Sequence, residues 1–263
     1  MWYIYEVKNQ NTSWGNVSDW YDHTVEDVDS YQQKVILPNL LRIVDPKNGV
    51  RVLDVGCGTG VFSRAFAEKG GIVLGLDLGS ELIEIARQRA VLKPGVLGQE
   101  KYVVCSADDL SKIQETDFDV ATIVLAIQNM KNLDKVIGEV NKKIKKGGRL
   151  ILVMNHPTFR IPQNSDWYYD EKSKIQYRKI ARYMSEIEIP ILMNPGNRNS
   201  KKTYSFHRPL QVYVKSLAKN GFVITKLEEW ISHKESQKGP KKNIEDMARK
   251  EIPMFMCLEC LKA

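Results

Sequence analysis

The sequence predicts an α/β protein built on a doubly wound, mostly parallel β-sheet. Two observations support this class. Short apolar runs alternate with amphipathic helical patterns over residues 49–154, as expected for successive βαβ units. In addition, the glycine-rich segment 56–60 follows one apolar run and precedes a helical pattern, which is the order of a strand, a tight turn and a helix.

The predicted strands are the apolar runs. Seven segments have this character: residues 50–55, 72–77, 102–105, 118–125, 149–154, 222–230 and 253–261. The fourth is almost continuously apolar, which suits a strand buried on both faces. The last two are joined by a lysine-rich loop and are expected to pair antiparallel. The prediction is a Rossmann-like, seven-stranded sheet whose last strand is antiparallel.

Helices are predicted where apolar residues recur at helical spacing. These segments are residues 30–44, 61–69, 133–144 and 209–220, and a further helix that begins at Ser80 with the serine as its cap. The pattern breaks after the fifth strand, where prolines and aromatic residues gather and a helical stretch is expected near residues 172–184. We therefore expect an N-terminal helical cover (1–48), a Rossmann-like domain (49–154 and 207–263) and an inserted cap (155–206) that lies over the sheet.

Composition narrows the class of protein. The 263 residues suffice for one core with insertions, and 43% hydrophobic with 27% charged residues is ordinary for a globular chain. No apolar run approaches the roughly 20 residues of a membrane span, and the first residues lack the order of a signal peptide. Cys257 and Cys260 form a C-x-x-C within a predicted strand, without a second ligand pair nearby. We expect reduced thiols, a cytoplasmic location and no metal.

The positive charge is unevenly placed. The chain carries a net charge of +7, and residues 157–250 hold 19 Lys and Arg against 10 Asp and Glu. RNA, a phosphorylated metabolite or a membrane surface would be attracted to such a segment. A solvated, lysine-rich surface explains the same excess without any partner.

The most informative segment is Asp54-Val55-Gly56-Cys57-Gly58-Thr59-Gly60 at the end of the first strand. Its glycines allow the backbone to approach a ligand closely before a helix N-terminus. Asp77, 17 residues after Gly60, ends the next strand, where a carboxylate accepts both hydroxyls of a ribose. A dinucleotide site shares this geometry. However, its glycine spacing is G-x-G-x-x-G, and Asp54 would repel a pyrophosphate.

On these residues the chain resembles the class I S-adenosylmethionine-dependent methyltransferases, by motif over residues 50–154 and by element order up to residue 263. The resemblance implies that S-adenosyl-L-methionine is bound and S-adenosyl-L-homocysteine released. It places Asp54, with the backbone of Gly56, Cys57, Gly58 and Gly60, around the methionine end of the donor. Asp77 would hold the ribose and Leu78 would contact the adenine.

The resemblance extends to the ends of the third and fourth strands. Asp108, or less favourably Asp109, would accept from the adenine amino group. The segment Leu125-Ala126-Ile127-Gln128-Asn129 would line the pocket beneath the methyl donor, with Gln128 and Asn129 towards the acceptor.

Methyl transfer requires few catalytic groups from the protein. Methyl transfer from a sulfonium is an in-line displacement that requires alignment of the nucleophile, with a base only if the acceptor carries a proton. Candidates for a base or a positioning group are His156, His207 and Tyr21, and candidates for acceptor binding are Arg160 and Arg208. Each has a structural alternative, such as a turn histidine, a salt bridge at a helix start or a hydrophobic anchor.

The acceptor is the open question. The segment Gln128-Asn129-Met130 departs from the Asp/Asn-Pro-Pro-aromatic motif of the methylases that act on the amino groups of DNA bases or glutamine. The inserted cap favours a small molecule, with an aromatic or carboxylate part. The alternatives are an RNA acceptor, including tRNA, because of the basic segment, a non-catalytic module that binds S-adenosylmethionine, and a nicotinamide dehydrogenase.

Overall fold

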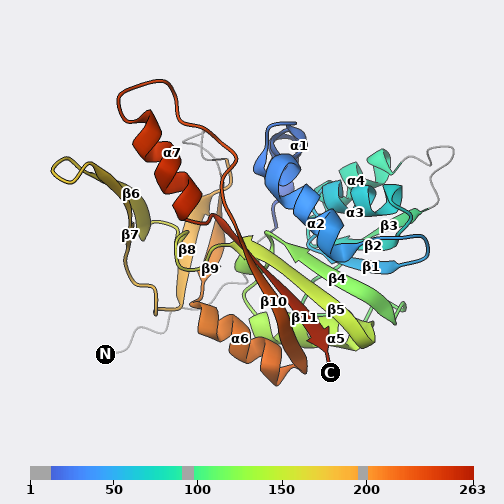
Figure 1. Cartoon of the computed structure of the whole chain (residues 1–263). Coiled ribbons are helices and arrows are strands. Elements are labelled where there is room, and N and C mark those ends of the chain that lie inside the picture. Colours follow the sequence, from blue (N-terminus) through green and yellow to red (C-terminus); the bar gives the residue numbers. More distant parts are fainter. Residues whose placement is uncertain (1–12, 91–97, 195–200) are drawn as a thin grey trace.

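A seven-stranded sheet forms the centre of the molecule, with the order β10-β11-β5-β4-β1-β2-β3 (Figure 1). The computed structural model describes residues 13–90, 98–194 and 201–263, so the N-terminal residues that lack signal-peptide character lie outside them. The strands of the sheet are β1 (Arg51–Val55), β2 (Ile72–Asp77), β3 (Gln99–Val104), β4 (Phe118–Val124), β5 (Ile144–Asn155), β10 (Phe222–Trp230) and β11 (Phe255–Lys262). The predicted sheet is confirmed.

Strand direction creates a crevice in the middle of this sheet. β1 pairs in parallel with both β2 and β4, and β11 alone runs antiparallel to its neighbours β5 and β10. The chain first moves outwards from β1 to β3 and then crosses back to β4 on the other side of β1. In an open α/β sheet, ligands bind beyond the carboxyl ends of the strands at such a reversal.

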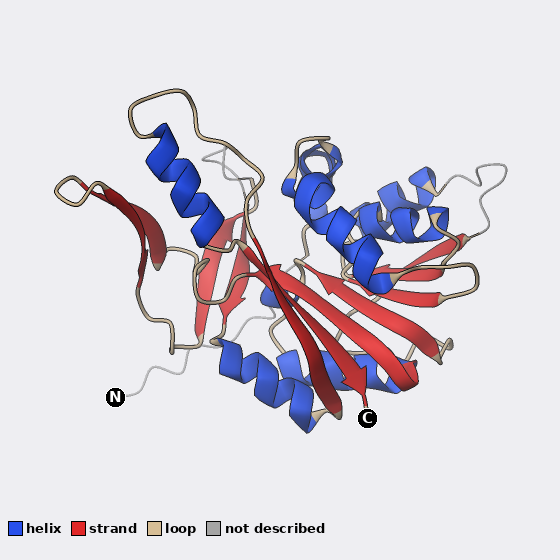
Figure 2. Ribbon diagram, viewed as in Figure 1, coloured by secondary structure: helices blue, strands red, loops and turns tan. Residues whose placement is uncertain are grey.

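Helices cover both faces of the sheet (Figure 2). One face packs against α2 (Leu37–Val44) and α3 (Val61–Glu68), and α4 (Ser80–Arg89) lies beside β2 and β3. The other face packs against α5 (Leu133–Lys143) and α6 (Leu210–Lys219). The central strands β1 and β4 are buried on both faces, because their side chains meet a helix whichever way they point.

The predicted helix over residues 30–44 is confirmed, with an irregularity in its middle. A π-helical turn, η2 (Gln32–Ile36), leads into α2, whose first turn contains Pro38. Proline has no N–H and its ring crowds the carbonyl four residues earlier, so a wider turn before it relieves the conflict. Upstream of it lie the 3₁₀ turn η1 (Gly15–Val17) and α1 (Ser18–Glu26).

The segment after β5 contains two hairpins, and the helix expected near residues 172–184 is wrong. β6 (Ser165–Asp170) pairs antiparallel with β7 (Ile175–Ile180), and β8 (Ile187–Leu192) with β9 (Lys202–His207). Asp170 fixes the first turn, since its Oδ1 accepts from the amide of Lys172 at 2.9 Å. Aromatic and β-branched residues on both sides of this turn favour paired strands.

Three further details differ from or refine the sequence prediction. The lysine-rich loop contains a helix, α7 (Lys242–Glu251), which was not predicted. Ser80 is the first residue of α4, and its hydroxyl donates to Glu81, so it does not cap the helix as expected. Cys257 and Cys260 belong to core clusters on opposite faces of the sheet, which separates the two thiols of the C-x-x-C. None of the helices in the described residues is both long and apolar enough to cross a membrane.

Candidate active site

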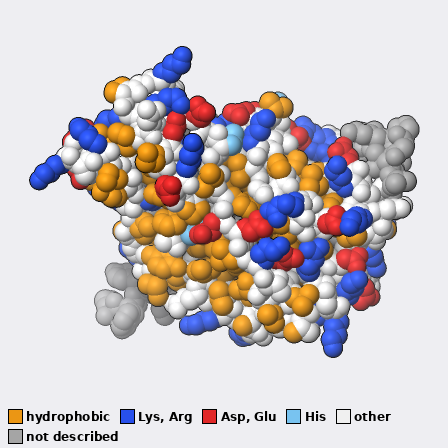
Figure 3. Space-filling view, viewed as in Figure 1, with side chains coloured by type: hydrophobic (Ala, Val, Ile, Leu, Met, Phe, Trp, Pro, Cys, Tyr) orange, Lys and Arg blue, Asp and Glu red, His pale blue; other side chains and the backbone are white. Residues whose placement is uncertain are grey.

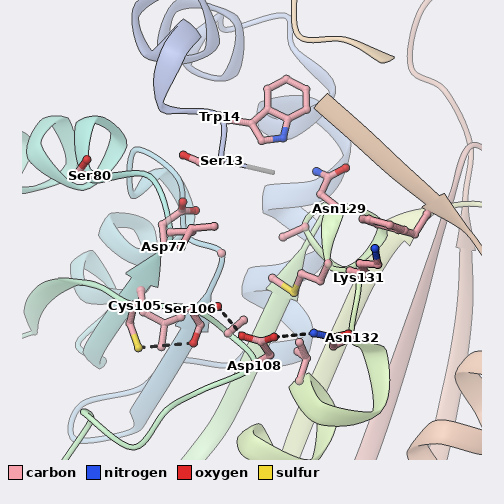
Figure 4. A pocket seen from close by; sticks show the side chains of 18 of the residues that line it. Ser13, Trp14, Asp77, Ser80, Cys105, Ser106, Asp108, Asn129, Lys131 and Asn132 are labelled. Carbon is pink, nitrogen blue, oxygen red and sulfur yellow. Dashed lines mark hydrogen bonds between the residues drawn. The ribbon is translucent and has the colours of Figure 1, made fainter. Parts of the chain in front are cut away.

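A cleft of about 720 Å³ opens beyond the carboxyl ends of β1, β2, β3 and β4 (Figure 4). This volume is in the usual range for sites that enclose a small molecule. The residues that line the cleft are Ser13, Trp14, Gly56, Leu76, Asp77, Leu78, Ser80, Glu81, Cys105, Ser106, Ala107, Asp108, Ala126, Asn129, Met130, Lys131, Asn132, Val136 and Phe206. Most come from the turns that follow the strands, as the strand reversal predicts.

The glycine turn after β1 is held against the end of β2. The amides of Gly56 and Cys57 both donate to the carbonyl of Leu76, at 2.7 and 3.0 Å. Gly56 has a φ of +74°, and a Cβ there would lie 2.6 Å from the Cβ of Ala126. Gly60 has a φ of +79°, and a Cβ there would meet the Tyr102 ring. Only glycine allows this turn to lie so close to its neighbours.

Asp77 connects the glycine turn to the cleft. Its Oδ2 accepts from the amide of Gly58 at 3.0 Å and its Oδ1 from the amide of Gly79 at 2.8 Å. Burial raises the pKa of this carboxyl group, although the backbone amides oppose that shift. Each carboxylate oxygen retains a second lone pair, and Asp77 lines the cleft, so it can accept from a ligand as well.

A second carboxylate, Asp108, lines the cleft after β3. Its Oδ1 accepts from the Ser106 hydroxyl at 2.6 Å and its Oδ2 from the Asn132 amide at 2.8 Å. The hydrogen bond from Ser106, followed by that from Asn132, lowers the pKa of Asp108. Asp109 instead accepts from the amide of Ser111 at 3.2 Å and does not line the cleft.

Asp54 lies behind the glycine turn. Its side chain is buried, and its two oxygens accept from Ser63 at 2.6 Å and Thr122 at 2.8 Å. These bonds tie β1 to α3 and β4. Burial raises the pKa of Asp54 to about 6. Asp54 is therefore positioned to fix the turn, while Asp77 and Asp108 face the cleft.

Comparison with known proteins identifies this arrangement. The model of a methyltransferase domain family matches residues 53–152, the segment from β1 to β5 that contributes most of the cleft. The fold also matches the crystal structure of an S-adenosylmethionine-dependent methyltransferase from Listeria monocytogenes, with a TM-score of 0.66 and 25% identity over 86% of this chain and 97% of that one. The chain belongs to the class I S-adenosylmethionine-dependent methyltransferases.

Two other similar proteins differ in the share of the chain that they cover. A methyltransferase from Mesorhizobium loti has the same fold, with a TM-score of 0.64 and 23% identity over 85% of this chain and 96% of that one. A ubiquinone biosynthesis O-methyltransferase from Xanthomonas euvesicatoria pv. vesicatoria is 38% identical, but only over 40% of this chain and 42% of its own length. The second match spans less than half of each chain.

The turn after β4 is strained in this methyltransferase. Leu125 has a φ of +51°, an uncommon conformation for a residue with a side chain. The Gln128 side chain stabilises the turn by donating to the carbonyl of Leu125 at 2.7 Å. As a result, Ala126 and Asn129 line the cleft, whereas Leu125 and Gln128 do not. The 3₁₀ turn η3 (Ile127–Asn129) carries Asn129 to its place below Trp14 (Figure 4).

The N-terminal segment contributes Trp14 to the cleft. Tyr21, the aromatic residue singled out from the sequence, packs instead on the glycine turn, where a Cβ on Gly58 would lie 3.0 Å from its ring. The rings of Trp14 and Tyr21 are 5.9 Å apart. Burial, followed by the charge of Asp77, raises the pKa of Tyr21, so the phenol stays protonated at neutral pH and is not available as a base.

His156 has a structural environment. Its Nδ1 accepts from the amide of Thr158 at 3.2 Å, so Nε2 carries the proton and donates to Glu229 on β10 at 2.7 Å. Burial lowers the pKa of His156, and its ring lies 4.7 Å from that of Phe159. It follows β5 as predicted but does not line the cleft.

His207 and Arg208 lie between β9 and α6. His207 donates through Nε2 to the carbonyl of Tyr183 at 2.9 Å. The Nη2 group of Arg208 donates to the carbonyls of Met130 and Lys131, at 2.8 and 2.7 Å. Arg208 therefore braces the loop that carries part of the cleft wall, and neither residue lines the cleft itself.

Several cleft residues were not predicted. Trp14 comes from the N-terminal segment, Phe206 from the inserted segment, and Lys131 and Asn132 from the loop before α5. An aromatic residue in a predicted cover was a usable signal for Trp14. Phe206 had no such signal, because pairing of β8 with β9 is what carries it to the cleft.

The buried Asp54 predicts a distinctive pH dependence of stability. Folding raises its pKa, so the folded chain holds the proton more tightly than the unfolded chain. The stability from Asp54 is thus full below the unfolded pKa of about 3.8 and lost as the pH rises through about 6. We expect the free energy of unfolding of the wild type, minus that of Asp54→Asn, to be about 2 kcal/mol larger at pH 4.5 than at pH 7.5. Urea unfolding at the two pH values measures this, and a difference independent of pH would contradict it.

Proposed function

We propose that this methyltransferase binds S-adenosylmethionine in the described cleft and transfers its methyl group to a small-molecule acceptor. The observation that carries the proposal is the arrangement of carboxylates around the glycine turn. Asp77 and Asp108 line the cleft at the ends of two adjacent strands, and Asp54 lies behind the turn. These charges suit a ligand with a sulfonium and an ammonium group, and oppose a pyrophosphate.

The residues of the cleft fit the donor part by part. Asp77 would accept the ribose hydroxyls, Leu78 would contact the adenine, and Asp108 would accept from the adenine amino group. The backbone of the turn at Gly56, with the adjoining Gly58, would approach the methionine end. The indole N–H of Trp14 is buried and has no acceptor among the described residues, so a bound donor would supply one.

The bound donor supplies a methyl group already activated by its sulfonium. The protein contributes orientation and exclusion of water. The glycine turn and Asp77 fix the position of the donor, and Trp14 covers the cleft from the N-terminal side (Figure 4). Asn129 and Phe206 line the remaining wall and would orient the acceptor. His156, His207 and Tyr21 lie outside the lining, so we assign them to positioning the walls.

The inserted segment supports a small-molecule acceptor. The hairpin β8–β9 delivers Phe206 to the cleft, so this part of residues 155–206 contacts the site as the predicted cap would. Ser13 and Trp14 of the N-terminal segment line the same cleft. The four free, buried thiols also support the expected reducing, cytoplasmic environment.

Replacement of Asp77 tests donor binding. We expect Asp77→Ala to weaken the affinity for S-adenosylhomocysteine by tenfold or more, because each lost charge-assisted hydrogen bond contributes about 1.5–3 kcal/mol. Isothermal titration calorimetry measures this. Glu115→Ala removes the same charge from an exposed site and serves as the control, and thermal unfolding verifies that both variants fold. Equal affinities in Asp77→Ala and the control would refute the ribose assignment.

An RNA acceptor is the second candidate, favoured by the hairpin β6–β7. Lys179 lies 3.8 Å from the ring centroid of Tyr168 and Lys241 lies 3.9 Å from that of Tyr169. Figure 3 shows basic and hydrophobic side chains together on the projecting part of the surface at the upper left. Basic and aromatic groups of this kind bind single-stranded nucleic acid through backbone charge and base stacking.

The salt dependence of tRNA binding separates the two acceptor classes. Filter binding at 50–200 mM salt would show a steep fall in affinity if several phosphates are contacted, as an RNA acceptor requires. We expect no measurable binding even at the low-salt end. Tight, strongly salt-dependent binding that Lys179→Gln weakens would replace the small-molecule proposal with the RNA one.

A further inference from the structure

A second, smaller hollow lies beyond the carboxyl end of β5. It is a notch of about 30 Å³ whose polar wall consists of Arg160, Arg178, Arg249, Tyr31 and Ser232, with Trp167 beside them. We call it the arginine notch. These residues come from the loop after β5, the hairpin β6–β7, the helix α7, the loop after β10 and the start of the predicted helix 30–44. Three guanidinium groups from three separate elements thus meet in one place.

Two of the three arginines are anchored by the protein. Arg178 donates through Nε to the carbonyl of Phe159 at 2.8 Å and through Nη2 to the Ser165 hydroxyl at 3.0 Å. Arg249 donates to the Ser236 hydroxyl through Nε at 3.3 Å and Nη2 at 3.1 Å. Each keeps further N–H donors, because a guanidinium has five in a planar fork.

Arg160 has no such anchor. No side-chain hydrogen bond or ion pair of Arg160 occurs within residues 13–90, 98–194 and 201–263, and the residue is partly buried. Burial lowers the pKa of Arg160, and burial together with the charge of Arg160 lowers that of Arg178. The notch therefore holds like charges close together in a partly desolvated place.

The carboxylates near the notch do not neutralise it. Glu245 lies 4.0 Å from the Nη2 of Arg249, at the limit of an ion pair. Asp166 interacts with Arg178 only at longer range, and its Oδ1 accepts from the amide of Trp167 at 2.8 Å. Burying cations without a partner is costly, and a bound anion would offset that cost.

Hydroxyl groups complete the wall. The Tyr31 hydroxyl and the Ser232 hydroxyl are 3.1 Å apart, and Ser232 also accepts from the amide of Lys234 at 3.1 Å. When the Ser232 hydroxyl donates this hydrogen bond to the Tyr31 oxygen, the Tyr31 hydroxyl is free to donate into the notch. A volume of 30 Å³ is roughly that of two water sites, at about 10–15 Å³ each. This suits the head group of a ligand and excludes a whole metabolite.

The arginine notch lies beyond the strand next to β4. Phe159 and Arg160 follow β5, and β5 is the immediate neighbour of β4, whose following turn lines the donor cleft. We propose that the arginine notch binds an anionic head group, a phosphate or a carboxylate, of the methyl acceptor. This inference rests on the proposed function. It narrows the acceptor class to anionic small molecules, with Arg160 as the main recognition residue.

Inorganic phosphate is the direct probe. NMR titration of the full chain at constant ionic strength would follow the Trp167 indole and the arginine side-chain N–H signals. We expect saturable shifts at the notch, and an affinity for phosphate that Arg160→Gln lowers by about tenfold or more through loss of a bidentate contact. Acetate in place of phosphate distinguishes a carboxylate site from a phosphate site. Arg160→Lys should recover part of the affinity, and it also keeps the test valid if Arg160→Gln folds poorly.

Lys172→Gln is the matched control, since it removes one positive charge from the exposed turn of the hairpin β6–β7. It should leave the phosphate affinity within about twofold. Equal phosphate titrations in Arg160→Gln and Lys172→Gln would overturn the notch as an anion site. Binding of S-adenosylhomocysteine, measured in the same samples, should not change in either variant. If the wild type did not bind S-adenosylhomocysteine, the proposed function itself would be overturned.

The link to the acceptor needs a transfer assay. The protein would be incubated with methyl-tritiated S-adenosylmethionine and a microbial metabolite extract separated into anionic and uncharged fractions. We expect label in the anionic fraction, and at least tenfold less with Arg160→Gln than with Lys172→Gln. Label confined to the uncharged fraction, at a rate that Arg160→Gln does not alter, would contradict an anionic acceptor.

Discussion

The close contact between the glycine turn and the end of β2 is the constraint on which the site depends. The carbonyl of Leu76 accepts from two amides of the turn, and Asp77 accepts from a third. These bonds hold two adjacent strand ends together and leave Asp77 at the floor of the cleft. A side chain at Gly56 would collide with Ala126 and separate them. The donor cleft therefore follows from backbone packing that only glycine allows.

Charge is arranged around this contact in layers. Asp54 is buried behind the turn and bonded to two hydroxyls, so it stabilises the junction of β1, β4 and α3. Asp77 and Asp108 face the cleft and are available to a ligand. On the β5 side of the same sheet edge the charge is positive, because Arg160, Arg178 and Arg249 line the notch. A cationic donor and an anionic acceptor would thus be attracted to neighbouring places.

The sheet and the donor half of the site were predictable from the sequence because their signals are local. The strand, the glycine turn and the following acid lie within residues 50–77, and each is meaningful without knowledge of the rest of the chain. The environment of the histidine candidates could not be predicted, because their hydrogen-bond partners are distant in the sequence. His156 bonds to Glu229, 73 residues away, and His207 bonds to Tyr183 across the inserted segment. Such partners are set by tertiary packing. Tertiary packing also assembles the arginine notch. Arg160 could therefore be named from the sequence, whereas Arg178 and Arg249 could not.

We propose that the cleft beyond β1–β4 binds the adenosyl donor. A crystal structure of the protein with S-adenosylhomocysteine tests it most directly. We expect ribose hydroxyls within hydrogen-bond distance of the Asp77 carboxylate, about 2.5–3.0 Å, and an adenine amino group directed at Asp108. A ligand bound elsewhere, or an adenosine that does not contact Asp77, would contradict it.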